Sequence, residues 1–445
     1  MTRGFATVPD APAYRLCGAR VPIALVHQGG IAGDREGFAH VDVTVSGGKI
    51  LSIAPHGGFT LDGELPAADL GGRIVLPRLV DIHTHLDKGH IWPRKPNSDG
   101  TFTGALEAAG ADREARWSAE DVRRRMDFSI RCALAHGTGA IRTHLDSIGP
   151  QTAISWPVFA EMREQYAGRI ALQAVALFSL LAAIETPDEF GAVVETTARH
   201  GGILGGVTYL GQAPDGRTDA ALDRVFEAAI AHGLDLDFHV DESEAPDART
   251  LERVADAAIR HRFRGKIVAG HCCSLALMGE ADAARVIAKV AEARVAVVSL
   301  PMCNMYLQDR RPGRTPRWRG VAPLHELAQA GVAVMAASDN TRDPFYAYGD
   351  LDMLEVLREA TRILQLDHAG RDWIRAVACT PADIMGLDRH GRLESGDAAD
   401  MIITRARSMS ELLARPQSDR TVLLAGRPID TTPPDYAELD ALMRP

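Results

Sequence analysis

The chain has 445 residues, more than a single small core usually supports and enough for one large barrel with an accessory piece. Hydrophobic residues make up 46% of it and charged residues 24%, which argues against a disordered or fibrous protein. The formal net charge of −10 argues against a nucleic-acid partner, because proteins that bind phosphates concentrate Lys and Arg.

Targeting signals and disulfide patterns are not visible in the sequence. No segment reaches the roughly 18 consecutive apolar residues of a membrane span, and residues 1–14 lack a basic stretch followed by a long apolar run. We therefore expect a cytoplasmic protein without a membrane partner. The six cysteines show no short repeated spacing, so we expect buried thiols. The oligomeric state is not determined by the sequence, which is compatible with a homo-oligomer.

Short apolar runs at both ends of the chain predict β-strands. Residues 41–53 alternate apolar side chains around Gly47-Gly48 and predict a β-hairpin. Residues 401–404 and 421–424 predict further short strands near the C-terminus. Because isolated hairpins are marginally stable in water, we expect residues 1–76 and 389–445 to combine into one small β-domain, a β-sandwich formed from both termini.

Residues 77–388 alternate short apolar runs with amphipathic segments, the pattern of repeated β–α units around a parallel sheet. Two of the predicted helices are residues 119–136 and residues 219–232, the second followed by Gly233. Eight predicted strands favour an α/β fold of the closed (β/α)₈ TIM-barrel type over an open sheet. These strands are residues 79–83, 140–144, 170–177, 205–209, 234–239, 266–271, 295–300 and 332–337.

Histidines follow several of these strands, at the barrel rim where catalytic groups are mounted. His83 and His85 are two residues apart, so on a strand both imidazoles face one side and could bind one ion. Two hydrogen-bonded surface histidines would be the simpler interpretation of an isolated pair. The position of this pair at a strand end favours the metal site.

Carboxylates accompany the histidines at the rim. His239 ends the fifth strand and Glu242 follows three residues later, a spacing that suits one metal ligand and one proton carrier. Asp339 follows the eighth strand and would complete a three-histidine site, offsetting part of the charge of the ion and leaving a position for water. The alternatives are a solvated loop carboxylate for Glu242 and a helix N-cap for Asp339.

Two further histidines lie at predicted strand ends. His271 follows Val268-Ala269-Gly270 and could be a ligand or the base that polarises water, of which we prefer the second. His144 stays unassigned, because a hydrogen-bonded strand-end histidine is at least as expected there as a catalytic one.

Taken together, the rim segments resemble the amidohydrolase superfamily and, within it, the cytosine deaminase branch. The resemblance extends from about residue 70 to residue 430, with the motifs in matching order. The segment at residues 396–403 is similar to the strand on which these enzymes return to their small β-domain. The other matching segments are Leu76-Pro77, Asp81–Asp87 (DIHTHLD), Arg142–Asp146 (RTHLD), Phe238–Glu242 (FHVDE), Gly270-His271 and Ser338–Phe345 (SDNTRDPF).

The resemblance implies one catalytic divalent transition-metal ion per chain, zinc or iron. It also implies that Glu242 shuttles protons and that His271 and Asp339 accept or steady the proton of the attacking water. Binuclear relatives carry a modified lysine at the end of the fourth strand, and residues 205–210 contain no lysine, so a single-metal site is implied. The implied metal ligands are His83, His85, His239 and Asp339.

Three positions depart from the cytosine deaminase pattern. Ser179 stands where the branch has the Gln that reads the pyrimidine edge, Asn340 where it has a second Asp, and Phe345 where it has a Trp. Loss of the Gln leaves polar edges of cytosine unpaired, at about 1–3 kcal/mol each. We therefore predict hydrolytic deamination of a small aminated nitrogen heterocycle that is cytosine-like but not cytosine, with release of ammonia.

Lys88, which follows His85-Leu86-Asp87, resembles the isopropylammelide amidohydrolases of the same branch, and we expect it to contact substrate. An exposed loop lysine is the alternative. Release of an alkylamine from a triazine-like ring, or opening of a cyclic amide, is therefore the alternative reaction. A non-catalytic barrel is disfavoured because no predicted ligand is missing, and a dinucleotide-dependent enzyme because no Gly-x-Gly-x-x-Gly follows a first strand.

Overall fold

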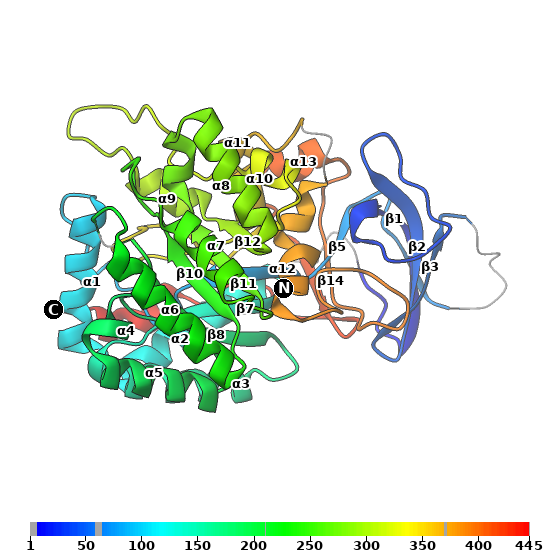
Figure 1. Ribbon diagram of the computed structural model, residues 1–445. Coiled ribbons are helices and arrows are strands. Elements are labelled where there is room, and N and C mark those ends of the chain that lie inside the picture. The colour runs from blue at the N-terminus through cyan, green and yellow to red at the C-terminus, as the bar shows by residue number, and fades with distance from the viewer. Residues whose placement is uncertain (1–6, 58–64, 210, 369–371, 445) are drawn as a thin grey trace.

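The computed structural model describes residues 7–57, 65–209, 211–368 and 372–444, and the structural statements below concern these ranges. A large barrel and a smaller group of strands lie side by side (Figure 1). None of the helices in the described ranges is long and apolar enough to cross a membrane.

Eight parallel strands form one sheet in chain order, so the predicted (β/α)₈ barrel is confirmed. Each predicted run overlaps one of these strands. A backbone bridge between Thr84 and Asp339 links the first strand to the segment after the last one. The strands are β6 Leu79–Thr84, β7 Thr138–Asp146, β8 Ala171–Leu177, β9 Ile203–Val207, β10 Leu236–Val240, β11 Ile267–His271, β12 Val295–Ser299 and β13 Val334–Ala336.

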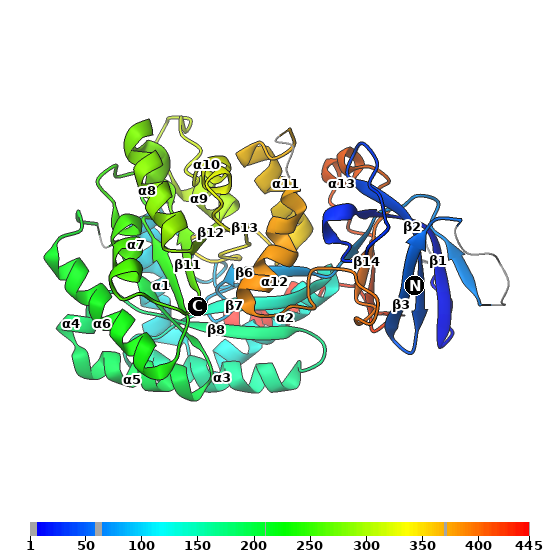
Figure 2. The same ribbon diagram turned by 45° about the vertical axis from the view of Figure 1, so that its right-hand side comes forward.

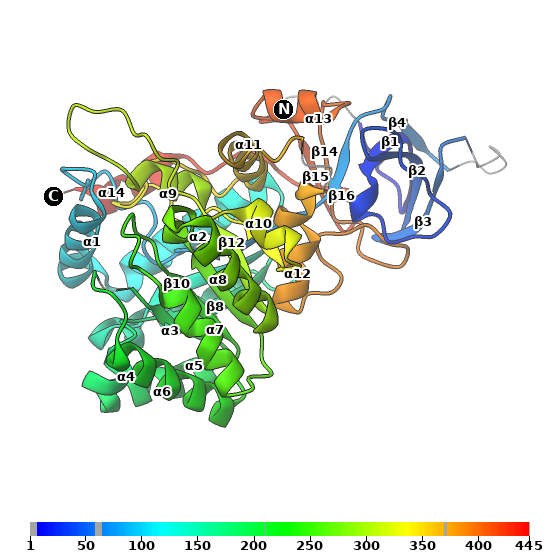
Figure 3. The ribbon, with the colours of Figure 1, turned by 45° about the horizontal axis from the view of Figure 1, so that its top comes forward.

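Helices cover the outside of the barrel (Figures 1 and 3). The predicted helix α2, Ala119–His136, begins where the side chain of Ser118 accepts a hydrogen bond from the Asp121 backbone and ends at Gly137, whose φ is 87°. The other helices are α1 Phe102–Arg116, α3 Thr152–Gln165, α4 Ala182–Glu185, α5 Pro187–Arg199, α6 Gly216–His232, α7 Thr250–Arg260, α8 Glu280–Glu292, α9 Pro301–Leu307, α10 Leu324–Gln329, α11 Met353–Leu364, α12 Cys379–Met385, α13 Met409–Ala414 and α14 Asp440–Met443. Short 3₁₀ helices are η1 Ile23–Leu25, η2 Gly149–Gln151, η3 Cys273–Leu277, η4 Trp373–Val377 and η5 Tyr436–Leu439.

The smaller part contains two four-stranded sheets, in the orders β3-β2-β1-β4 and β16-β15-β14-β5. The predicted hairpin is confirmed, since β2 and β3 pair antiparallel across Gly47 and Gly48. One buried apolar cluster contains residues from both ends of the chain, including Val43 and Met401. Figure 2 shows β14, near the C-terminus, in the same part of the molecule as β2 and β3. These strands are β1 Ala13–Pro22, β2 Phe38–Ser46, β3 Lys49–Pro55, β4 Ala67–Asp69, β5 Val75–Pro77, β14 Met401–Ile403, β15 Thr421–Leu424 and β16 Arg427–Pro428.

After β16 the chain leaves the two four-stranded sheets. In Figures 1 and 3 the C-terminus lies beside α1, on the side of the barrel away from β1, β2 and β3. We propose residues 1–76 with 389–445 as one unit of the chain and residues 77–388 as the barrel unit. Within the first unit, residues 436–443 contact the barrel rather than the two four-stranded sheets.

Candidate active site

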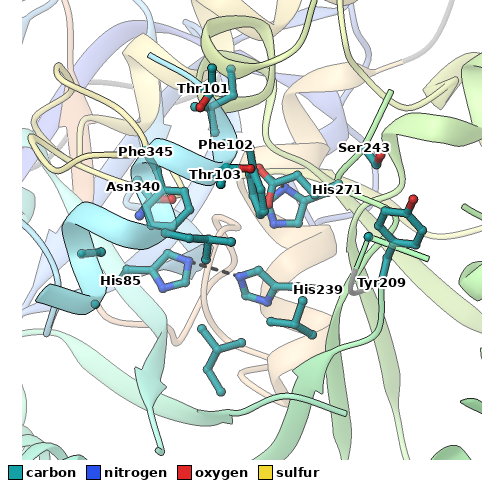
Figure 4. Close-up of a pocket in the computed structure, with 18 of the residues that line it drawn as sticks. His85, Thr101, Phe102, Thr103, Tyr209, His239, Ser243, His271, Asn340 and Phe345 are labelled. Atoms are coloured by element: carbon teal, nitrogen blue, oxygen red, sulfur yellow. Dashed lines mark hydrogen bonds and ion pairs between the residues drawn. The ribbon is translucent and has the colours of Figure 1, made fainter. Parts of the chain in front are cut away.

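Side chains on β6 and β10 and just after β6 and β13 meet inside the mouth of the barrel. Oδ1 of Asp339 lies 3.6 Å from Nε2 of His83 and 3.3 Å from Nε2 of His85. Nε2 of His85 lies 3.2 Å from Nε2 of His239 (Figure 4). These contacts bring the four residues expected to bind metal close together.

Local backbone geometry places these groups. His83 and His85 lie on the same side of β6 because strand residues alternate in direction. Asp339 has a φ of 64°, and its backbone N–H donates to the carbonyl of His83 over 2.8 Å. The hydroxyl of Thr84 donates to the carbonyl of Asp339 over 2.7 Å. The carboxylate of Asp339, which follows the last barrel strand, is thus fixed against His83 and His85 of the first strand, where the barrel closes.

The chemistry of this cluster fits a divalent cation. Burial lowers the pKa of the His83, His85 and His239 imidazoles well below 6.5, so the rings stay neutral and their lone pairs remain available. Burial raises the pKa of Asp339 to about 7, with the charge of Asp343 adding to the rise and that of Lys88 only partly opposing it. A divalent ion would offset that penalty. Atoms without a hydrogen-bond partner in the described ranges include both ring nitrogens of His83, Nδ1 of His85 and His239, and both carboxylate oxygens of Asp339.

A second arrangement of ligands overlaps the first. One nitrogen or oxygen from each of His83, His239, His271 and Asp339 lies within 4.8 Å of the others. His271 therefore lies close enough to compete with His85 for the position of third imidazole ligand.

The hydrogen bonding of His271 separates these two arrangements. Nδ2 of Asn304 lies 2.9 Å from Nδ1 of His271, and an amide nitrogen can only donate. Burial also lowers the pKa of His271 to about 3, so the ring is neutral, and with the Asn304 nitrogen toward Nδ1 its hydrogen is on Nε2. An N–H at Nε2 can hold a water molecule but cannot bind a metal ion.

Glu242 lies beside His271 and near Asp339. Its Oε1 is 3.4 Å from Nδ1 of His271 and accepts a hydrogen bond from Asn304 over 3.2 Å. Burial, reinforced by the charge of Asp339, raises the pKa of Glu242 well above 4.5. A carboxyl group in this state can carry a proton at neutral pH.

Asn304 is a residue that the sequence analysis missed. It lies on α9 and is fully buried, with one amide nitrogen within reach of both Glu242 and His271. Its only sequence signal is its position just after the seventh predicted strand, at the same rim as the other groups.

A cavity of about 660 Å³ lies over the cluster, within the range of roughly 300–1,000 Å³ for small-molecule pockets. Figure 4 shows His85, His239 and His271 at this cavity. Helix α1 supplies one wall through a face that includes Phe102 and Ala109. The four residues expected to bind substrate also line it: Lys88, Ser179, Asn340 and Phe345.

Lys88 is only 6% exposed, so it is not the exposed loop lysine of the alternative interpretation. Its Nζ lies 3.3 Å from Oδ1 of Asp146 and 5.0 Å from the centroid of the Phe345 ring. Burial lowers the pKa of Lys88, but Asp146 and Asp343 outweigh that effect and the net pKa is raised. The wall of the cavity therefore holds a buried positive charge.

The positions that depart from the cytosine deaminase pattern differ in their surroundings. Nδ2 of Asn340 donates to Asp343 over 2.6 Å, and the Phe345 ring meets that of Phe102 edge to face at 5.7 Å. Ser179 is half-buried and bridges to Val207 through its backbone.

His144, the histidine left unassigned, lies behind the cluster. Its ring centroid is 4.0 Å from that of His83, and its Nε2 is 3.8 Å from Oδ1 of Asp237. It is fully buried and is not among the residues that line the cavity. Its contacts therefore place it against a candidate ligand rather than against a substrate.

Comparisons with known proteins identify a matching family, similar sequences and a similar solved structure. The sequence model described as "Amidohydrolase family" matches residues 156–430. The chain is 53% identical to "Pterin deaminase" of Rhizobium rhizogenes over 444 residues, which is 100% of both chains. It is 23% identical to "N-isopropylammelide isopropyl amidohydrolase" of a Pseudomonas species over 378 residues, 82% of this chain and 88% of the other. The structure of 5-methylcytosine deaminase from Klebsiella pneumoniae, liganded with phosphonocytosine, shares the fold with a TM-score of 0.78 at 24% identity, covering 93% of this chain and 97% of that one.

Proposed function

Because the chain belongs to the amidohydrolase family, we propose that it hydrolytically deaminates an aminated nitrogen heterocycle with the help of a bound metal ion. The observation that carries this proposal is the convergence of three imidazoles and one carboxylate beneath a cavity that also contains Glu242. The full-length similarity to a pterin deaminase supports a fused, pterin-type ring as the substrate.

The proposed cofactor is one divalent transition-metal ion per chain, zinc or iron. Neutral imidazoles with one carboxylate form a donor set that suits either ion. When bound, such an ion supplies the Lewis acidity that makes water a nucleophile near neutral pH. The proposed ligands are His83, His85, His239 and Asp339.

The proposed reaction moves protons through the residues beside the metal site. Asp339 accepts a proton of the attacking water, and the Nε2–H of His271 steadies that water. Glu242, protonated at the start, gives its proton to the ring nitrogen, and the two protons of the water then supply the departing amine and restore Glu242. A carbon–oxygen bond forms, the exocyclic carbon–nitrogen bond breaks, and the products are a ring carbonyl and ammonia.

The proposed substrate contacts come from Lys88, Ser179, Asn340 and Phe345. Phe345 offers an apolar face to a planar ring, while Lys88 and the two neutral polar side chains offer hydrogen bonds to its edge. The proposed partner is therefore a small heterocycle. The net charge of −10 supports the expectation that nucleic acid is not a partner. Cytoplasmic location, independence of membranes and assembly into a homo-oligomer remain predictions.

The substrate proposal is tested by measuring ammonia release from pterin and from cytosine with the metal-loaded enzyme. We expect kcat/KM of about 10⁴ M⁻¹s⁻¹ or more for pterin and at least about 10²-fold less for cytosine, whose edge lacks partners at Ser179 and Asn340. Changing both residues together, Ser179→Gln with Asn340→Asp, should shift the preference towards cytosine.

Two outcomes would contradict this proposal. Cytosine turnover in the ordinary enzyme range of about 10⁴ M⁻¹s⁻¹ or above would mean that the three departures do not set specificity. Isopropylamine released from N-isopropylammelide, in place of ammonia from pterin, would favour the alternative reaction on a triazine ring. Hydrolysis of a cyclic amide would be recognised by a ring-opened product without ammonia.

Asn304→Ala tests the proton path. The Asn304 hydrogen bond lowers the pKa of Glu242, so its removal should raise that pKa further. Because Glu242 must be protonated before it can give a proton to the ring nitrogen, the basic limb of the kcat/KM profile should move to higher pH, by up to about one unit for a hydrogen bond to a charged group. Met305→Ala, on the exposed side of the same helix, is the matched control and should leave the limb in place. A uniform loss of activity without a shift would exclude this role of Asn304.

A further inference from the structure

Residues Tyr436–Met443, near the end of the described chain, run along the outside of the barrel beside α1 and α2 (Figures 1 and 3). We refer to these residues as the C-terminal segment. Leu439 packs in one apolar cluster with Phe128 and Cys132 of α2. The carboxylate of Glu438 pairs with Arg131 at 2.6 Å. These contacts fix the segment to the barrel and leave Tyr436 facing the mouth loops.

The ring of Tyr436 contacts two loops of the barrel mouth. The guanidinium of Arg342, in the loop after β13, lies over this ring at 4.2 Å from its centroid. The ring of His90, in the loop after β6, lies 6.1 Å from it, centroid to centroid. The Tyr436 hydroxyl also donates to Oδ1 of Asp350 over 3.1 Å.

These two loops carry proposed substrate contacts and are joined to each other. The loop after β6 contains Lys88, and the loop after β13 contains Asn340 and Phe345. The backbone N–H of His90 donates to the carbonyl of Thr341 over 3.0 Å. Movement of either loop would therefore displace residues on both sides of the cavity.

Strand pairing between β6 and β13, where the barrel closes, is short, and two backbone hydrogen bonds join the loops that follow them, from His90 to Thr341 and from Trp92 to Arg342. Strand β13 has only three residues, and the link to β6 is the single bridge between Thr84 and Asp339. His90, Asp339 and Arg342 have φ values of 67°, 64° and 49°, in the left-handed region that non-glycine residues adopt only when their surroundings hold them. Nε of Arg342 has no hydrogen-bond partner within the described ranges, and the Tyr436 ring lies against this guanidinium.

A second link reaches the helical wall of the cavity. The guanidinium of Arg94 donates to the carbonyl of Leu442 over 3.2 Å and pairs with Asp112 of α1 at 2.8 Å. The C-terminal segment thus connects to α1 as well as to both loops.

We propose that the C-terminal segment positions the substrate-binding loops of the barrel mouth, with Tyr436 as the positioning residue that holds the loops after β6 and β13 together. The proposal rests on the proposed function for the identity of the substrate contacts. It does not make Tyr436 a catalytic residue, since this side chain does not line the cavity.

The test compares Tyr436→Leu and Tyr436→Phe in the full-length, metal-loaded chain. Tyr436 is 42% exposed, so both changes should leave the buried core intact. Loss of the ring in Tyr436→Leu should raise the KM for pterin at least about 5-fold with kcat changed less than about 2-fold, while Tyr436→Phe, which keeps the ring over Arg342, should stay close to the parent. Hydrogen exchange of residues 339–346 should rise in Tyr436→Leu and not in Tyr436→Phe.

Glu438→Gln is the matched control, because it removes the ion pair with Arg131 on the same segment without touching either loop. It should leave KM and the exchange of residues 339–346 unchanged. An equal KM increase in Glu438→Gln would mean that the segment acts through general stability and would overturn the proposal. If Tyr436→Leu does not fold, Arg342→Gln removes the same contact from the other side and should give the same KM increase and faster exchange.

The exchange measurement separates this proposal from the proposed function. If the parent enzyme does not deaminate pterin, faster exchange of residues 339–346 in Tyr436→Leu still supports the positioning role. Unchanged exchange in both Tyr436→Leu and Arg342→Gln overturns it, whatever the substrate.

Discussion

Replacing Glu242 with Gln is expected to lower kcat by about 10²-fold or more while the metal content stays the same. The substitution keeps the volume of the side chain and its hydrogen bond from Asn304, but an amide cannot carry a proton at neutral pH. Glu242 lies 3.4 Å from His271 and, although it is near Asp339, it is not one of the proposed ligands, so the metal content should be unaffected. Steady-state kinetics and elemental analysis of the same sample check both parts.

Glu252→Gln provides a control for the loss of one carboxylate. Glu252 lies on α7, where it pairs with Arg285 and Lys289 on the outside of the barrel. Its replacement should leave kcat unchanged. Loss of metal in Glu242→Gln would contradict the proposed role, because it would make Glu242 a ligand rather than a proton carrier.

Much of this site was predictable because it depends on short-range patterns. Alternation along β6 puts His83 and His85 on one face, and the parallel order of the strands brings their C-terminal ends to one rim. The convergence of His239 and Asp339 on that rim follows from the same topology. The predicted superfamily is confirmed by the family match and by the 53% identical relative.

One strand boundary shows where pattern fails. The fourth strand was predicted at residues 205–209, whereas β9 spans Ile203–Val207. A Cβ on Gly205 would lie 2.4 Å from the carbonyl oxygen of Asp237, so the neighbouring strand leaves room only for glycine there. From the sequence alone the same glycine is predicted to begin the strand, because the close approach of a neighbouring strand leaves no pattern in the nearby residues.

The parts of the site that could not be predicted depend on contacts between distant segments. Asn304 meets Glu242 across 62 residues of chain. Tyr436 reaches Arg342 from beyond the small β-sheets, after a region whose pattern predicts strands in another part of the molecule. Periodicity identifies which face of an element is buried but not which remote segment covers it.

Changing His239 to Ala is expected to reduce metal occupancy below about one tenth and kcat/KM by at least about 10³-fold, since the ion and its Lewis acidity are lost together. Elemental analysis of the unaltered protein should give one transition metal per chain. Two metals per chain would exclude the single-ion site. His232→Ala, at the exposed end of α6, is the matched control and should change neither value.

Elemental analysis also distinguishes the two overlapping ligand sets, which have either His85 or His271 as the third imidazole. Nδ1 of His271 accepts from Asn304, which leaves a hydrogen on Nε2, whereas Nε2 of His85 lies 3.3 Å from Asp339 and 3.2 Å from His239. His85→Ala should therefore empty the site. His271→Ala should keep the metal and lose turnover. If the two variants behave in the opposite way, His271 is the third imidazole ligand, its proton is on Nδ1, and the Asn304 amide must present its oxygen to the ring.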